Sequence, residues 1–565
     1  MAVVFCFPKF SLIIFTRKYL ATTLSLGLVR LCIKHAKNTI KFTFLRQKKF
    51  LENPIIVIFV GMATKALFNT VVNWFIRQRI DQIQNFMDHP IETQKGILFS
   101  QLFHAEDTEY GKKYGFNSIL SYQDFKNKVP IITYEEMEPY IEKARQGQKD
   151  ISWPGYIKHF AKSSGTTNAK SKFIPISAES LEYCHMKAGK DMVSIYANNH
   201  PENQLFNYKN LRLGGSSELY ADFNTKFGDL SAILIDNLPF WVEVTTTPSK
   251  KVSLMGEWES KLKAITSEVK NEDVGSILGV PSWMMVLLQR VLKETEFNNI
   301  SELWPNLEVF FHGGISFKPY REQYRQIIGK SINYYEIYNA SEGFFGIQDR
   351  SNSDEMLLML DYGIFYEFIP MDQFHSSNPN VVNLEDVEVG KNYAMVITTN
   401  GGLWRYLIGD TVVFTSTNPF RIKITGRTKH YINAFGEELM ITNVESALTK
   451  ACEETNAAVS DFTGAPVFMK ENESGAHEWI FEFCKKPDDL DRFTDIFDNH
   501  LKSINSDYEA KRYNNITLKR PIVHIAKPNL FYCWLESKGK LGGQNKVPRL
   551  SNDREYIDPL LELNR

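Results

Sequence analysis

The chain of 565 residues is 43% hydrophobic, 23% charged and 13% aromatic, an ordinary globular composition that excludes collagen-like, disordered and disulfide-scaffold classes. With 65 basic and 66 acidic residues its formal net charge is −1, so nothing indicates a nucleic-acid or anionic-membrane partner. The six cysteines form no CxxC pair and the twelve histidines no HExxH pattern, which argues against a structural zinc site and favours a reducing, cytoplasmic setting.

The first 61 residues differ from the rest. Residues 1–51 carry ten Lys and Arg but no Asp or Glu, and their uncharged runs are shorter than the ~18–20 apolar residues that span a bilayer. We therefore expect no stable membrane insertion. A transit or signal segment is one interpretation, but no small-residue cleavage site follows a clean apolar run. We favour the alternative that residues 1–61 are a non-native or disordered extension and that Met62 is the natural start.

Periodicity predicts helices over 66–87 and 91–104. Beyond residue 150 the chain alternates helical stretches with short β-rich runs, among them 232–235, 307–311, 332–338 and 393–399. This alternation predicts an α/β fold with a largely parallel or mixed sheet. A strand-like run over 421–426 precedes a smaller α/β pattern, so we predict a large domain at 62–425 and a small one at 426–565.

Residues 163–175 read SSGTTNAKSKFIP, a composition suited to phosphate binding. Small residues let backbone N–H groups approach an anion, hydroxyl groups donate to phosphate oxygens, and lysines neutralise charge. The segment is not GxxxxGK[ST], so a Walker-type loop is excluded. Taken alone, such a segment is more often a polar surface loop.

Three further segments contain a carboxylate or paired glycines that could take part in binding. In 338–343 (YNASEG) a glutamate follows a strand-like run, and a carboxylate fixed at a strand end suits a hard cation such as Mg²⁺. The segment 405–410 (RYLIGD) closes on an aspartate, which can accept hydrogen bonds from two hydroxyl groups at once. In 311–314 (FHGG) the paired glycines would let the backbone lie flat against a ring. Each has a plain alternative as a turn or a solvated strand end.

Segments of less certain meaning complete the set. Residues 426–439 (GRTKHYINAFGEEL) begin the predicted small domain. Residues 542–549 (GGQNKVPR) carry Lys546, whose plain interpretation is an exposed surface lysine. The apolar stretch 280–285 (VPSWMM) could wall a pocket for a hydrophobic acid, although such a stretch is more often helix core.

In this order the segments resemble those of the auxin-responsive promoter family of acyl-acid amido synthetases, within the adenylate-forming (acyl-CoA synthetase/luciferase-like) superfamily. The resemblance covers about 90–565 and implies a large N-terminal adenylate-forming domain with mixed sheets and flanking helices, followed by a small mobile α/β C-terminal domain. One departure is Thr167-Asn168-Ala169, where the family usually has Ser/Thr-Gly-Gly. Fewer glycines make a stiffer loop.

The resemblance also implies ATP and Mg²⁺ as cofactors and assigns roles to residues. Glu342 would hold Mg²⁺, and Lys546 would reach the reacting α-phosphate, which makes these two the candidate catalytic residues. The remaining implied nucleotide-binding residues are Ser163, Ser164, Gly165, Thr166, Thr167 and Lys172 for the phosphates, Gly313, Gly314, Tyr338 and Ser341 near adenine, Asp410 for the ribose, and Arg427 and Lys429 at the hinge.

The implied reaction has two steps: ATP-dependent adenylation of a carboxylic acid, then transfer of the acyl group to an amine, most simply that of an amino acid. Partners would be small molecules, and we expect a monomer. Two alternatives stay open: an acid–thiol ligase that uses coenzyme A, and a non-catalytic nucleotide-binding relative, against which Glu342, Asp410 and Lys546 argue. The sequence indicates neither the acid, nor the acceptor, nor a general base for the amine.

Overall fold

The computed structural model describes residues 3–7, 10–14 and 76–565, apart from 164–171, 215–218, 223–224, 316, 318–319, 375, 377–378, 429–430, 471–472 and 538–546. The chain divides into two units, Met1–Phe75 and Ile76–Arg565. In the first unit, β1 (Val3–Phe7) pairs antiparallel with β2 (Phe10–Ile14). Within the described ranges, no helix has both the length and the apolar character needed to cross a membrane.

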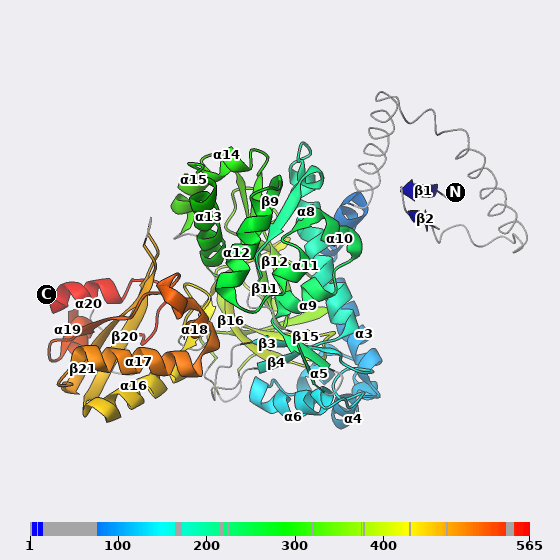
Figure 1. The fold of residues 1–565 in the computed structure, drawn as a ribbon. Coiled ribbons are helices and arrows are strands. Elements are labelled where there is room, and N and C mark those ends of the chain that lie inside the picture. The colour runs from blue at the N-terminus through cyan, green and yellow to red at the C-terminus, as the bar shows by residue number, and fades with distance from the viewer. Residues whose placement is uncertain are drawn as a thin grey trace, which may run out of the picture. The chain divides into compact units, whose positions relative to one another are not determined.

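Eleven strands of the second unit form one mixed sheet (Figure 1). Five of them, β8, β5, β9, β10 and β11, pair in parallel, so their carboxyl ends share one edge, and the remaining pairs are antiparallel. Across the sheet the strands are β14 (Ile364–Pro370), β15 (Asn392–Thr399), β16 (Tyr406–Thr417), β17 (Phe420–Arg427), β13 (Met356–Leu358), β12 (Gly343–Ile347), β11 (Asn333–Ala340), β10 (Val309–Gly313), β9 (Val274–Gly279), β5 (Lys209–Arg212) and β8 (Thr246–Thr247).

This sheet is buried on both faces. Successive residues Phe310 and Phe311 of β10 enter two different hydrophobic cores, because neighbouring side chains of a strand point to opposite faces. All seven residues of β14 are buried, as are the last seven of β15. Strands covered on both faces read as continuous apolar runs. The predicted strands at 307–311, 332–338 and 393–399 are confirmed, with small shifts at their ends. Their apolar runs made them recognisable in the sequence.

The predicted strand at 232–235 is wrong, because this segment is helix α9 (Leu230–Asp236). Ala232, Ile233 and Ile235 are buried, so the helix uses the apolar run for packing. A short apolar run does not by itself distinguish a buried strand from a buried helix, and the tertiary packing decided the outcome here.

Beside the main sheet, a four-stranded sheet has the order β4 (Lys172–Ile176), β3 (His159–Ser163), β7 (Thr225–Gly228) and β6 (Tyr220–Asp222). The predicted helix at 91–104 is confirmed as α3 (Pro90–Ala105), which begins with proline in its first turn and buries Leu98 and Leu102. The described part of the predicted helix at 66–87 is helical over 76–88. The other helices of this part include α4 (Glu109–Tyr114), α5 (Tyr122–Lys128), α6 (Tyr134–Arg145), α8 (Lys187–Asn199), α10 (Phe240–Thr245), α12 (Trp258–Val269), α13 (Pro281–Thr295) and α15 (Arg321–Ile328).

The C-terminal part has its own small sheets and helices. β18 (Tyr431–Ile432) pairs with β19 (Leu439–Met440), and a second sheet has the order β20 (Ala458–Val467), β21 (Ala476–Lys485) and β22 (Ile522–Ile525). The helices are α16 (Ile441–Thr455), α17 (Leu490–Ile504), α18 (Ser506–Arg512), α19 (Leu530–Ser537) and α20 (Ile557–Asn564). β17 continues to Arg427, two residues past the last residue of the large domain as the sequence predicts it.

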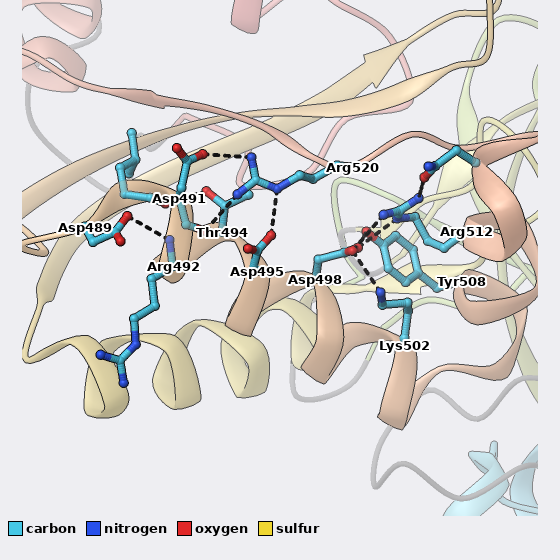
Figure 2. A network of polar contacts seen from close by, with 12 residues as sticks. Asp489, Asp491, Arg492, Thr494, Asp495, Asp498, Lys502, Tyr508, Arg512 and Arg520 are labelled. Carbon is cyan, nitrogen blue, oxygen red and sulfur yellow. Dashed lines mark hydrogen bonds and ion pairs between the residues drawn. The ribbon is translucent and has the colours of Figure 1, made fainter.

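A polar network joins α17 to α18 (Figure 2). The Asp498 carboxylate accepts hydrogen bonds from Arg512 Nε and Nη2, both at 2.8 Å, and from Tyr508 Oη at 2.7 Å. Lys502 adds an ion pair at 3.1 Å. Because the Asp498 and Arg512 side chains are each only 6% exposed, this bidentate pair fixes the position of α18 on the small domain.

Candidate active site

Glycines mark the carboxyl edge of the parallel strands. β9 ends at Gly279, β10 ends at Gly313, and Gly214 follows β5 after one residue. A Cβ on Gly313 would lie 2.4 Å from the carbonyl oxygen of Ile337, so a larger residue would clash with the β11 backbone. Gly314 has φ +85°, a left-handed conformation that favours glycine. Ligands of open α/β sheets bind outside this edge, so the predicted pair Gly313–Gly314 lies where a ligand can approach the backbone.

Tyr338 and Asp410 meet although 72 positions separate them. Tyr338 Oη donates to Asp410 Oδ2 at 2.7 Å, and the two residues are only 5% and 7% exposed. Tyr338 lies near the end of β11, whereas Asp410 lies in β16 opposite Arg427 of β17. A hydrogen bond to an ionised carboxylate is shorter and stronger than a neutral one. The Tyr338 hydroxyl therefore orients the carboxylate to which the resemblance assigns the ribose.

Ser341 and Glu342 form the tight turn between β11 and β12, in which Ala340 pairs with Gly343. Both side chains are half-buried. Glu342 is four residues beyond Tyr338, at most about 13 Å further along the chain at the rise of a strand. The turn thus places Glu342 at the same carboxyl end of β11 as Tyr338.

The structure gives only the base of the predicted phosphate-binding segment. Ser163 is the last residue of β3 and pairs with Lys172, the first of β4. Lys172 Nζ lies 5.2 Å from the centre of the Tyr134 ring, and the Tyr134 hydroxyl accepts from the backbone N–H of Phe173 at 2.9 Å. Helix α6 therefore supports the end of this hairpin. The side chain of Ser163 and the whole of Ser164, Gly165, Thr166 and Thr167 lie outside the described residues.

Sequence reasoning assigned no role to Arg405, which anchors the segment that leads to Asp410. Its guanidinium forms a bidentate pair with Glu367 at 2.8 and 2.9 Å, and the two side chains are 5% and 1% exposed. Nη1 also donates to the carbonyl of Val129 at 2.7 Å, and Tyr122 donates to Glu367 at 2.9 Å. Arg405 has φ +42°, an unusual backbone conformation that this network of contacts holds in place. The sequence could not reveal this role, because Arg405 and Glu367 lie 38 positions apart and pair only in the folded chain.

The hairpin that follows the predicted hinge is organised around Glu437, which is fully buried. Its carboxylate accepts from the backbone N–H groups of Ala434 at 3.2 Å and Phe435 at 2.7 Å, and it bonds His477 Nε2 at 2.7 Å. The Arg427 side chain and all of Lys429 lie outside the described residues, so their hinge role stays a prediction.

This hairpin contacts the loop that follows β10. Asn433 Nδ2 donates to the carbonyl of Gly314 at 3.4 Å, and Tyr320 Oη donates to the carbonyl of Ala434 at 2.8 Å. The small domain therefore reaches the glycine edge through the side chain of Asn433.

A second contact between the domains involves the apolar stretch 280–285. Lys511 Nζ lies 3.5 Å from the centre of the Trp283 ring, and burial lowers the pKa of Lys511 to about 8. Met284 and Met285 are fully buried in the hydrophobic core. These positions favour the core interpretation of the stretch over that of a pocket wall.

Lys546 also lies outside the described residues, but the segment after it is well anchored. Val547 is 4% exposed, and the carbonyl of Arg549 accepts from the backbone N–H of Gly464 in β20 at 2.9 Å. The Arg549 guanidinium forms an ion pair with Glu445 of α16 at 2.7 Å. Residues 547–549, which directly follow Lys546, are therefore fixed to the small domain.

Three family matches follow one another along the chain. The GH3 family N-terminal domain matches residues 79–332, the central domain 357–427 and the C-terminal domain 442–555, together well over half of the chain. The chain belongs to the GH3 family. Its resemblance to the auxin-responsive family of amido synthetases is thereby confirmed.

Relatives of this GH3 chain are distant. It is 26% identical over 374 residues to jasmonoyl–L-amino acid synthetase JAR4 of Nicotiana attenuata, an alignment that covers 54% of this chain and 63% of that protein. It is 22% identical over 567 residues to indole-3-acetic acid-amido synthetase GH3.15 of Arabidopsis thaliana, covering 84% of this chain and 92% of the relative. The chain thus spans somewhat less than two thirds of the length of JAR4.

Solved structures share the GH3 fold. The AtGH3.15 acyl acid amido synthetase in complex with 2,4-DB has a TM-score of 0.54 at 17% identity and covers 84% of this chain and 93% of its own. A 2-hydroxyisobutyryl-CoA ligase has a TM-score of 0.51 at 14% identity and covers 83% of this chain and 92% of its own. The predicted fold class, a mixed α/β large domain with a smaller α/β C-terminal domain, is confirmed.

The donor set at the edge of this GH3 fold suits magnesium that arrives with a nucleotide. Among the residues the structure describes, no group of three or more His, Cys, Asp or Glu side chains could form a protein cage for a metal. Mg²⁺ bound to a nucleotide needs only one or two carboxylates, because phosphates and water supply the other oxygens. Glu342, fixed on a tight turn, fits that requirement.

Proposed function

We propose that this chain activates a carboxylic acid with ATP and transfers the acyl group to the amine of an amino acid. The supporting observation is the convergence of the glycine edge, the turn with Glu342 and the buried Tyr338–Asp410 pair. The relatives are named as a jasmonoyl–L-amino acid synthetase and an indole-3-acetic acid-amido synthetase, and we extend this class of amide-forming reaction to this chain.

In the first step the substrate carboxylate attacks the α-phosphorus of ATP, an acyl–phosphate bond forms, and the bond to pyrophosphate breaks. The protein's task is to hold the two reactants in line and to neutralise the charge that builds on the phosphoryl oxygens. Asp410 would accept from the ribose hydroxyls, and the backbone at Gly313 and Gly314 would lie against adenine beside Tyr338 and Ser341. Ser163, Ser164, Gly165, Thr166, Thr167 and Lys172 would bind the phosphates.

Glu342 would hold Mg²⁺, which supplies positive charge to the phosphate oxygens when it is bound. Lys546 would add a second positive charge at the α-phosphate when the small domain closes, and Arg427 and Lys429 would form the hinge. In the second step the amine nitrogen attacks the acyl carbon, the bond to AMP breaks, and the amine loses a proton.

The test is acid-dependent exchange of labelled pyrophosphate into ATP, followed by a comparison of amino acids with coenzyme A as acceptors. Exchange with at least one carboxylic acid supports the first step, and amide formation supports the second. Thioester formation without amide would favour the acid–thiol ligase. No exchange with any acid, together with intact ATP binding, would leave a non-catalytic nucleotide-binding protein.

Asp410→Asn is the sharpest variant for the nucleotide site, because it keeps the shape and still accepts from Tyr338. Loss of a charged acceptor for the ribose should weaken ATP binding roughly 10- to 100-fold. Asp372→Asn, at an exposed position, is the matched control. Equal ATP affinity in all three proteins would remove Asp410 from the site.

We further infer that the functional chain consists of a large domain over 62–425 and a small domain from 426 to 565, with residues 1–61 outside it. We also propose that it acts as a cytoplasmic monomer. Truncation before Met62 tests the first inference, because the shortened protein should keep its ATP affinity. Size-exclusion chromatography with light scattering tests the second.

A further inference from the structure

Well-buried arginines in this fold are paired with carboxylates. The side chains of Arg79, Arg405, Arg421 and Arg512 are between 4% and 11% exposed. Each forms two hydrogen bonds with one carboxylate, from Asp191, Glu367, Asp349 and Asp498 respectively. This is the usual arrangement, because an unpaired buried charge is strongly destabilising.

Arg212, at the end of β5, departs from this arrangement. Its Nη2 donates to Thr246 Oγ1 at 2.7 Å, while its Nε is buried and makes no hydrogen bond. Among the described residues no carboxylate forms an ion pair with it; the nearby Glu243 pairs with Lys250 at 3.8 Å instead. Burial lowers the pKa of Arg212 to about 10, although Glu243 acts in the opposite direction.

Thr246 fixes the direction of this guanidinium. The hydroxyl of Thr246, which is 8% exposed, donates to the carbonyl of Val242 at 3.0 Å, so its oxygen is left to accept from Arg212. Nε and Nη2 form the edge that the other four arginines present to a carboxylate; in Arg212 one N–H of Nη2 is used by Thr246, and Nε has no acceptor. A carboxylate could still accept two parallel hydrogen bonds, from Nε and from the second N–H of Nη2.

Arg212 also lies at the edge where the nucleotide site is proposed. It is in register with Leu278 of β9, which is in register with Phe311 of β10. At the usual strand spacing the Arg212 and Phe311 Cα atoms are about 10 Å apart, and Gly313 follows Phe311 by two residues. Gly279 and Gly313 themselves contribute no side chains to this stretch of the edge.

We propose that Arg212 binds a carboxylate group of a substrate. The inference rests on the proposed function and deepens it, because both the acid and the amino acid of that reaction can supply such a group. One source is the α-carboxylate of the acceptor amino acid. The other is a second carboxylate at the far end of the acid that is activated.

Two substrate pairs distinguish these sources in Arg212→Gln. For the acceptor, amide formation is compared between L-alanine and L-alaninamide, which lacks the carboxylate. For the acid, pyrophosphate exchange without acceptor is compared between hexanedioate and hexanoate. We expect Arg212→Gln to lose at least about 30-fold of one preference, as is usual when a buried charged partner is truncated. Loss of the alanine preference identifies the acceptor, and loss of the hexanedioate preference identifies the acid.

A binding measurement separates this proposal from the proposed function. L-alanine or hexanedioate should raise the melting temperature of the wild-type protein, and Arg212→Gln should abolish that shift even if no acid is turned over. Without ligand, Arg212→Gln should melt close to wild type, because it removes a partly buried charge that has no carboxylate partner among the described residues.

Two further variants complete the experiment. Arg212→Lys keeps the charge but not the fork and should recover only part of the preference, while Arg325→Gln, at an arginine whose side chain is 72% exposed, should change nothing. If Arg212→Gln does not fold, Arg212→Lys carries the test alone. Unchanged preferences and unchanged thermal shifts in the Arg212 variants would overturn the proposal.

Discussion

Replacing Arg405 by methionine should destabilise the large domain severely, because it leaves a buried carboxylate without its main partner. Glu367, whose side chain is 1% exposed, would keep only the hydroxyl of Tyr122 at 2.9 Å. Breaking a buried ion pair from one side costs about 3–5 kcal/mol. The carbonyl of Val129 also loses its 2.7 Å donor, so we expect the upper part of that range.

The double variant Arg405→Met/Glu367→Leu should recover most of this loss, because no buried charge remains. A surface comparison is available in Arg325, which pairs with Glu322 at 2.7 Å while the two side chains are 72% and 60% exposed. Arg325→Met should cost far less than Arg405→Met, because water screens an exposed ion pair.

Urea denaturation followed by tryptophan fluorescence measures these differences, and fully buried Trp404 is adjacent to the mutated position. ATP affinity should fall in Arg405→Met as well, since β16 carries Asp410. If Arg405→Met unfolds at the same urea concentration as Arg325→Met, then Arg405 does not anchor the strand and the reasoning fails.

Three other outcomes are expected. Burial lowers the pKa of His312 to about 3, whereas in the unfolded chain the pKa is about 6.5. As the pH falls from 6.5 to 3, the unfolded chain therefore binds a proton that the folded chain does not, and the free energy of unfolding decreases by up to about 1.4 kcal/mol per pH unit. His312→Phe should therefore flatten the acid side of the stability profile, and an unchanged slope would contradict this. Lys511→Met should melt no lower than wild type, because burial already disfavours the charged amine beside Trp283; a clear drop would show that attraction to the ring dominates. Lys546→Ala should slow formation of the acyl-adenylate more than amide formation from preformed adenylate, as rapid-quench kinetics can show, and equal slowing of both steps would argue against its place at the α-phosphate.

Part of the site was predictable because residue chemistry is local. A strand end followed by Glu342 and a short segment that closes on Asp410 are visible in the sequence, and helix α3 follows from its apolar spacing and its proline. By contrast, the run at 232–235 carried no periodicity that could separate strand from helix, and its burial against neighbouring segments made it part of α9.

The sequence by itself determined which side chains are available to the proposed nucleotide site and in what order they occur. Only the tertiary structure decided which residues distant in the sequence form hydrogen bonds and ion pairs with one another. Tyr338 reaches Asp410, Arg405 reaches Glu367, and Arg212 pairs with no carboxylate of the described residues, because hydrogen bonds depend on distances of about 3 Å that chain positions do not encode.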